Sequence, residues 1–340
     1  MRFPEKVRLA NLPTPVHRLD RLSAAFGVEA FAKRDDMTGG AESGNKIRKL
    51  EYVVRDLLDR GCDTLVTCGG ADSNHARAGA LAAARLGLRC TLILRRPPPG
   101  LVGNLFLDRL AGADIRFVEP ETYYEDFDRV REEVMSGLAA SGRKPYWVPT
   151  GASMPLGAVG YAGCAAEIAD HVRKTGSPFD VILFATGSGG TAAGLLVGVR
   201  ASGLDARVVG VNTGEPTGRL RAETLSIARG CADLLGVDMR LTAEDVVIVD
   251  GYDAGGYGMA DEAVFGTIRR FAAEEGLILD PVYTAKAASG LVGMLERGEI
   301  KRGERVLFVH TGGVFGLFAH HSELDGTAPK RRGNGIDESV

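Results

Sequence analysis

The sequence predicts an α/β protein with two lobes, each built on an open, mostly parallel, twisted sheet. Short β-branched and aliphatic runs alternate with longer stretches of helical period along most of the 340 residues. Two of the strand-like runs, 181–185 (VILFA) and 306–309 (VLFV), are apolar at every position. Strands of that composition are typical of a parallel sheet that helices cover on both faces. The alternation of strands and helices then indicates a doubly wound architecture.

The expected elements alternate after an extended start that contains Pro13 and Pro15. Runs rich in β-branched or aliphatic residues predict strands at 29–33, 64–68, 89–94, 114–118, 181–185, 207–212, 246–249 and 305–310. Apolar residues at helical spacing predict helices at 47–60, 74–86, 103–111, 123–142, 156–175, 191–201, 260–275, 285–297 and 314–320. These helices provide the crossover connections that parallel strands require.

Two loop-like segments, 38–44 and 149–155, divide this pattern and suggest the borders of the lobes. The strands and helices between them predict a small domain at 48–154. Residues 1–47 and 155–325 are then expected to form a larger, discontinuous domain. The polar, charged tail at 326–340 is predicted to be disordered.

Composition excludes several classes of function. A formal net charge of −3 does not favour nucleic acid or an anionic membrane as a partner. The chain has no run of 18 apolar residues, and residues 1–14 lack the apolar stretch of a secretory signal. Its five cysteines show no C-x-x-C spacing, so no metal site is expected, and their odd number fits a reducing compartment. We therefore expect a cytoplasmic protein that acts on a small molecule.

The first chemical motif is Lys46, which follows a glycine-containing loop and opens a predicted helix. A lysine amine forms a Schiff base when its pKa is lowered, which the positive end of a helix and the neighbouring Arg48 and Lys49 would do. The alternative interpretation is an exposed, cationic first turn.

The second motif is Ser73-Asn74, where a helix begins directly after a predicted strand and two glycines. Backbone amides at a helix start, together with these side chains, form a receptor for a carboxylate. The alternative is a simple N-cap, because serine and asparagine are preferred capping residues.

The third motif, 187–191 (GSGGT), links an apolar strand to a helix and predicts a phosphate-binding turn. It also matches G-x-G-x-x-A through Ala192, which leaves a nicotinamide dinucleotide site as an alternative. That site wants an acid about 20 residues further on, and Glu215 lies beyond that distance. Two last motifs place the hydroxyls of Thr284 and Thr311 at element ends, where each also fits as a cap or a turn residue.

Taken together, residues 3–322 resemble the family of D-cysteine desulfhydrases and 1-aminocyclopropane-1-carboxylate (ACC) deaminases. These are pyridoxal phosphate (PLP) enzymes built like the tryptophan synthase β subunit, so the resemblance implies PLP fold type II. The order and spacing of the motifs carry it: 33–36 (KRDD), 43–51 (SGNKIRKLE), 73–75 (SNH), 156–161 (LGAVGY), 187–191 (GSGGT), 280–283 (DPVY) and 310–313 (HTGG). The family also implies a homodimer.

By this resemblance, Lys46 would carry PLP as a Schiff base and move the α-proton. Further contacts to PLP are implied for Asn74, Gly187, Ser188, Gly189, Gly190, Thr191, Thr284 and Thr311. Asn74 would bind the 3-hydroxyl oxygen of PLP, and Thr311 would reach its pyridine nitrogen. Substrate contacts are implied for Ser73, Asn74, His75 and Tyr283. Ser73, Tyr257 and Tyr283 join Lys46 as expected catalytic residues.

The choice of reaction depends on Thr284 and Thr311. ACC deaminases carry glutamate and leucine at the matching places, whereas D-cysteine desulfhydrases resemble this chain. A neutral hydroxyl beside the ring nitrogen of PLP leaves a weaker electron sink than a carboxylate would, and expulsion of a thiolate needs only the weaker one. We therefore expect β-elimination from D-cysteine to pyruvate, ammonia and sulfide, with ACC deamination as the alternative.

Three residues depart from the family's pattern and are expected to reshape the pocket: Glu42, Asp72 and Met154. L-Cysteate, the substrate of another branch, is a further alternative. Asp72 beside the carboxylate site would repel its second anion.

Overall fold

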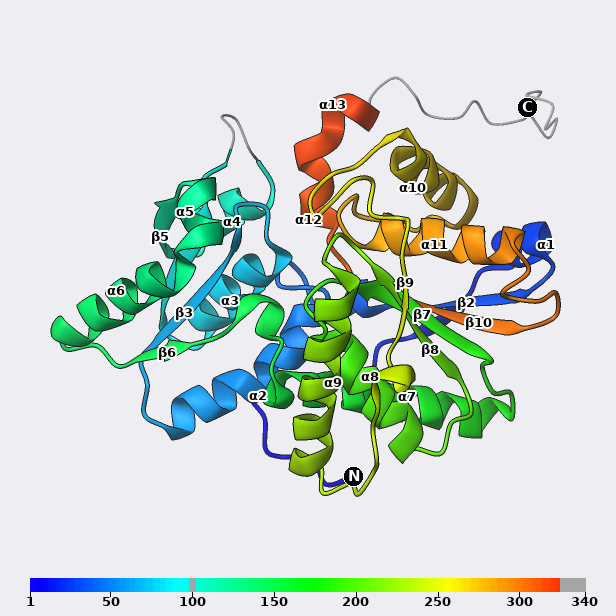
Figure 1. Ribbon diagram of the computed structural model, residues 1–340, viewed down its shortest axis with the longest axis horizontal. Helices are drawn as coiled ribbons and strands as arrows, with labels where there is room; N and C mark the ends of the chain where they lie inside the picture. The colour runs from blue at the N-terminus through cyan, green and yellow to red at the C-terminus, as the bar shows by residue number, and fades with distance from the viewer. Residues whose placement is uncertain (98–101, 325–340) are drawn as a thin grey trace, which may run out of the picture.

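The chain folds into two lobes, seen side by side in Figure 1. The computed structural model describes residues 1–97 and 102–324. Each lobe has one sheet, and helices cover the sheets. The predicted α/β class with open, mostly parallel sheets is confirmed. The predicted tail at 326–340 lies outside the described residues.

The six-stranded sheet of the larger lobe has the order β1-β2-β10-β7-β8-β9. Its strands are β1 (Val16–Arg18), β2 (Glu29–Lys33), β7 (Val181–Thr186), β8 (Arg207–Asn212), β9 (Val247–Val249) and β10 (Arg305–Val309). Strand β1 pairs antiparallel with β2, and every other pair is parallel. The last long strand, β10, lies between β2 and β7 and brings the C-terminal motif to the middle of the sheet.

The smaller sheet is parallel throughout and has the order β5-β4-β3-β6. Its strands are β3 (Thr64–Gly70), β4 (Arg89–Arg95), β5 (Asp114–Val118) and β6 (Pro145–Trp147). The helices of this lobe are α2 (Asn45–Asp59), α3 (Asn74–Arg85), α4 (Asn104–Leu110), α5 (Pro120–Glu125) and α6 (Phe127–Ala140). Apolar residues of α2 share one core with β3 and α3, and α2 also packs against α7 (Pro155–Thr175) of the larger lobe, so it connects the two lobes.

The helices of the larger lobe lie on both faces of its sheet (Figure 1). They are α1 (Asp20–Phe26), α7 (Pro155–Thr175), α8 (Gly190–Ala201), α9 (Thr217–Leu234), α10 (Glu262–Glu275), α11 (Thr284–Glu296), α12 (Val314–Leu317) and α13 (His321–Leu324). The packing of strand β7 explains why its sequence is apolar from Val181 to Ala185. Val181 and Leu183 pack in the core with α10 and α11, while Ile182 and Phe184 pack in the core with α7 and α8. Successive side chains of a strand point to opposite faces, and both faces of this one are buried.

The sequence interpretation missed α9, the short helices α1 and α13, and the short strands β1 and β6. The buried face of α9 is built mainly from small or weakly apolar residues, such as Thr224, Ala228 and Cys231, which give a faint helical pattern. The predicted helix at 123–142 is two helices, because Asp126 leaves helical geometry with φ −138° and ψ 29°. The domain boundaries and the homodimer stay predictions. Among the described residues, no helix has the length and apolar character needed to cross a membrane.

Candidate active site

A cavity of about 860 Å³ opens at the carboxyl ends of the central strands of both sheets. Its lining includes Gly70 at the end of β3, Gly187 directly after β7 and Thr311 two residues beyond β10, together with the start of α2. Ligand sites of open α/β sheets lie at this edge, because loops and helix starts converge there. The cavity therefore brings together motifs that are far apart in the sequence.

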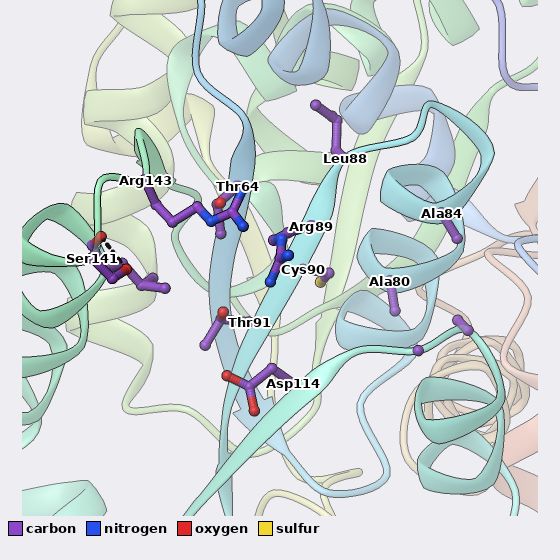
Figure 2. Close-up of a pocket in the computed structure, with 13 residues that line it drawn as sticks. Thr64, Ala80, Ala84, Leu88, Arg89, Cys90, Thr91, Asp114, Ser141 and Arg143 are labelled. Carbon is purple, nitrogen blue, oxygen red and sulfur yellow. Dashed lines mark hydrogen bonds between the residues drawn. The ribbon is translucent and has the colours of Figure 1, made fainter.

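A second cavity of about 300 Å³ lies within the smaller lobe (Figure 2). Its lining includes Thr64, Arg89 and Asp114, which are the first residues of β3, β4 and β5. It therefore lies at the amino ends of these parallel strands, opposite the edge where α/β enzymes bind ligands. We place the functional site in the larger cavity.

Lys46 lies at the second position of α2, and a glycine turn fixes how the helix begins. Gly44 adopts φ 115°, and a Cβ there would come within 2.9 Å of the carbonyl oxygen of Thr311. The next amide, that of Asn45, donates to the same oxygen at 2.9 Å. The start of α2 is therefore attached to the end of β10, which only glycine at position 44 allows without strain.

The Lys46 amine is poised for nucleophilic chemistry. Burial lowers its pKa to about 8; Asp280 opposes this shift and Arg77 adds to it. The amine donates to Asn45 Oδ1 at 2.9 Å and lies 5.6 Å from the centre of the Tyr283 ring. A lysine with this pKa has a substantial neutral fraction near physiological pH, which an ordinary lysine lacks.

The sequence prediction that Arg48 would lower this pKa is not what the structure shows. The Arg48 guanidinium is buried and donates to Asp35 and Glu167, with both ion pairs at 2.8 Å. Asp35 also accepts from the hydroxyl of Tyr161 at 2.8 Å. These contacts neutralise Arg48 and fasten α2 to the larger lobe, so its role here is structural.

Ser73 and His75 both line the cavity at the start of α3. The hydroxyl of Ser73 accepts from the amides of His75 and Ala76 at 3.2 Å each, so it caps the helix as the alternative interpretation expected. Thr67 donates its hydroxyl to the Val148 carbonyl at 2.7 Å and therefore accepts from His75 Nε2, 2.8 Å away. Burial, Lys46 and Lys49 hold the pKa of His75 well below its usual value. His75 is thus neutral, with Nδ1 as an acceptor.

The three departures from the family's pattern lie outside the cavity lining, and their effect on the pocket stays a prediction. Neither Glu42, Asp72 nor Met154 is among the described residues that line the cavity. Asp72 Oδ1 accepts from Asn104 at 3.0 Å, and its Oδ2 faces Gly316, where an added Cβ would be 3.1 Å away. The carboxyl group of Asp72 therefore points toward α4 and α12 and not into the cavity, while its charge still contributes to the raised pKa of Tyr257 and Tyr283.

All residues of the glycine turn at 187–191 except Gly190 line the cavity. Side chains do not fit there: a Cβ at Gly190 would lie 2.7 Å from Ser153 Oγ and 2.9 Å from Lys49 Nζ. The turn leads into α8, so its backbone amides and the helix dipole favour an anion.

Lys49 is a site residue that the sequence interpretation did not assign. Its amine is buried, lines the cavity and donates to the Gly151 carbonyl at 3.1 Å. Burial and the charge of Lys46 hold the pKa of Lys49 well below its usual value. The spacing of three residues between Lys46 and Lys49 could have revealed it, because such residues share one face of a helix.

Two tyrosines form the wall next to Lys46. The hydroxyls of Tyr257 and Tyr283 lie 2.8 Å apart, and burial raises the pKa of both. The buried amine of Lys286 donates to the carbonyls of Thr213 at 3.2 Å and Gly256 at 2.8 Å. Lys286 thereby holds the loop that carries Tyr257.

Of the three threonines that were expected to touch the cofactor, Thr191 lines the cavity with the glycine turn, whereas Thr284 and Thr311 have different surroundings. Thr311 lines the cavity just beyond β10. Thr284 is fully buried and is not among the described residues that line the cavity. Its hydroxyl donates a hydrogen bond to Asp280 Oδ1 at 2.7 Å. Its alternative interpretation as a helix-start residue fits this geometry, and a contact between Thr284 and PLP stays a prediction.

Residues 7–312 match the family model described as "Pyridoxal-phosphate dependent enzyme". This chain belongs to that family. Among curated relatives, a putative ACC deaminase of Pyrococcus abyssi is 41% identical, covering 95% of this chain and 96% of that protein. An ACC deaminase of Methylobacterium nodulans is 40% identical, covering 91% and 95%. The predicted membership in the family of D-cysteine desulfhydrases and ACC deaminases is confirmed, and so is the predicted cofactor, PLP. The alternative of a nicotinamide cofactor loses its support.

Solved structures place the chain in the predicted fold type. A crystal structure of an ACC deaminase homologue superposes with a TM-score of 0.87 at 39% identity and covers 95% of each chain. Threonine deaminase from Solanum lycopersicum, at 20% identity and a TM-score of 0.65, shares the fold. PLP fold type II is therefore confirmed, and the chain is a PLP-dependent lyase.

The cavity fits PLP at both ends of that cofactor. An amine of lowered pKa, Lys46, can bond to the aldehyde. The glycine turn lets its backbone approach Ser153 and Lys49 more closely than a side chain would allow, and the buried Lys49 amine beside it can donate to a phosphate, whose charge would favour the protonated amine. The lining of the cavity also contains Arg95, which is half-buried at the end of β4. Its guanidinium donates to the hydroxyl of Tyr124 and has no carboxylate partner among the described residues.

Proposed function

We propose that this PLP-dependent lyase removes the β-substituent of D-cysteine and, with one water, releases pyruvate, ammonia and sulfide. Lys46 would carry the cofactor, with its phosphate held by 187–191 and Lys49. Asn74 would bind the 3-oxygen of PLP, and Ser73 and the amides at the start of α3 would bind the substrate carboxylate.

The observation that carries this proposal is that Thr311, two residues beyond β10, lines the cavity. The nearby carboxylate, Asp280, accepts from the amides of Val282 and Tyr283 at 3.2 and 3.0 Å, and from the amide and hydroxyl of Thr284 at 2.8 and 2.7 Å. Asp280 is thus fully engaged in the turn before α11. A neutral hydroxyl remains for the ring nitrogen, and this suits a substrate with a good leaving group.

Proton transfer in the proposed reaction falls to Lys46 and the tyrosine pair. PLP supplies the sink for the electron pair left at the α-carbon. With a pKa of about 8, the freed Lys46 amine can accept the α-proton near neutral pH. The raised pKa values of Tyr257 and Tyr283 keep both hydroxyls protonated, so one of them can donate a proton to the departing sulfur.

A second candidate is the opening of ACC to 2-oxobutyrate and ammonia. Both curated relatives described above are named as ACC deaminases, which favours this reaction. L-Cysteate is a third test substrate, because Arg95 adds positive charge to the cavity and Asp72 points away from it.

A substrate panel separates these candidates. PLP-loaded protein is incubated with D-cysteine, L-cysteine, ACC and L-cysteate, and sulfide, sulfite, pyruvate, 2-oxobutyrate and ammonia are measured. We expect sulfide and pyruvate in equal amounts from D-cysteine, and no product with Lys46→Ala. Release of 2-oxobutyrate from ACC without sulfide from D-cysteine would overturn the proposal in favour of the second candidate. A visible PLP band without any turnover would indicate a non-catalytic PLP-binding protein.

A further inference from the structure

We infer that Asn104, on α4 and outside the cavity lining, is a positioning residue that fixes the amide of Asn74 so that only N–H groups face PLP. This inference rests on the proposed contact between Asn74 and the 3-oxygen of PLP. It adds a residue that no motif indicated, and it states which form of that oxygen the site accepts.

The argument starts at Arg77, a buried residue of α3. Its Nη2 donates to the Ser43 carbonyl at 2.6 Å, and its guanidinium lies 4.8 Å from the centre of the Phe315 ring. Its Nη1 lies 3.2 Å from the Asn104 side-chain oxygen. A guanidinium can only donate hydrogen bonds. The atom of Asn104 that faces Arg77 must therefore be its oxygen.

Asn104 then has its amide nitrogen on the opposite side. The residue is fully buried at the start of α4, and its Nδ2 donates to the backbone oxygen of Asp72 at 2.9 Å and to Asp72 Oδ1 at 3.0 Å. The same nitrogen lies 3.1 Å from Asn74 Oδ1. The chain turns closely here, because a Cβ at Gly103 would lie 2.3 Å from the Phe315 carbonyl. Asn104 is thus held on every side.

The orientation of Asn74 follows from that of Asn104. Because Asn104 presents a donor, the atom of Asn74 that faces it must be the oxygen. The Asn74 NH₂ group is then left over, in a half-buried residue that lines the cavity. Among the described residues, the Asn74 side chain has no second hydrogen bond. It therefore offers the cavity donors and no acceptor.

A donor-only amide prefers an oxygen that carries no proton. Opposite the 3-oxygen of PLP, it would stabilise the anionic form of that oxygen. An oxygen whose charge is already stabilised holds a shared proton less tightly, so the Lys46–PLP linkage would lose its proton at lower pH. The charged groups near this pair are Arg77 and the carboxylates that act on it, Asp108, Asp72, Glu42 and Asp280, together with Lys46 and Lys49, which act on the adjacent His75.

The test compares Asn104→Ala, Asn74→Ala and the double variant, all loaded with PLP. The readouts are the Kd for PLP and the pH midpoint of the change in the visible absorption band. We expect Asn104→Ala to weaken PLP binding by about fivefold, as for one lost hydrogen bond. We also expect its pH midpoint to rise, and the double variant to match Asn74→Ala. Where Asn104→Ala does not fold, Asn104→Ser serves, because its hydroxyl ends one bond short of Asn74.

Phe106→Ala is the matched control, because Phe106 lies on the same helix, is exposed and carries no charge. We expect its pH midpoint to equal that of the unmodified protein. Equal midpoints for Asn104→Ala and the unmodified protein, or shifts that add in the double variant, would overturn the inference. A protein that shows no PLP band before any substitution would instead overturn the binding of PLP, so the two failures are distinct.

Discussion

Replacement of Lys49 by methionine should stabilise the protein without PLP and weaken its hold on PLP. Lys49 is buried, and its only hydrogen bond among the described residues goes to the Gly151 carbonyl. Its pKa is lowered in the folded state, so the unfolded chain binds more protons at neutral pH. This lysine therefore costs stability below its unfolded pKa, and the cost grows as the pH falls. A methionine of similar length removes it.

The gain should be about 1 to 3 kcal/mol, the usual cost of burying a polar group with incomplete hydrogen bonding. PLP binding should change in the opposite direction. A hydrogen bond between Lys49 and the phosphate would be charge-assisted and worth about 1.5 to 3 kcal/mol, so its loss should raise the Kd for PLP roughly tenfold to a hundredfold.

The assay is a pair of measurements on Lys49→Met and the unmodified protein. Urea unfolding without PLP at pH 7 and pH 9 gives the change in stability, and titration followed by the visible band gives the Kd. Lys6→Met is a matched control, because Lys6 is partly exposed and pairs with Glu51 away from the cavity. A Lys49→Met protein that binds PLP as tightly as the unmodified one would refute the assignment of Lys49 to the phosphate.

Three further predictions concern the start of α2 and the tyrosine loop. The rate at which PLP reacts with the unloaded protein should rise with pH to a midpoint near 8, because only the neutral Lys46 amine attacks; a midpoint near 10 would contradict the lowered pKa. Lys286→Met should lower kcat by roughly tenfold with little effect on PLP binding, by freeing the loop at Gly256; an unchanged kcat would remove this role. Asp35→Ala should destabilise the protein by about 3 to 5 kcal/mol in thermal or urea unfolding, because it leaves Arg48 buried with one partner fewer; a loss below 1 kcal/mol would contradict it.

The fold was largely predictable because most of its strands and helices have a clear apolar pattern in the sequence. Strands such as β7 are buried on both faces, and helices α2, α3 and α8 begin at an asparagine or a glycine. Helix α9 was not predictable by the same rule, because its buried face is made mainly of small side chains. The break between α5 and α6 depends on the backbone angles of a single residue, Asp126, which composition does not reveal.

The candidate site was predictable where a motif sits at an element end, and not where side-chain direction decides. Lys46, Asn74 and Thr311, which were predicted as site residues, all line the large cavity. Asp72 directly precedes Ser73, yet its carboxyl group points to Asn104, and a sequence does not show such a rotation. The lowered pKa of Lys46 was expected from its charged neighbours, whereas burial is its main cause.

Borohydride reduction of the PLP-loaded protein, followed by peptide mapping, tests the central claim most directly. Reduction makes the bond between PLP and its lysine permanent, so the modified residue can be identified by mass spectrometry. We expect one PLP group per chain, attached to Lys46, and no attachment in Lys46→Ala. A PLP group found on Lys49 or Lys286 instead, or none at all, would contradict the account.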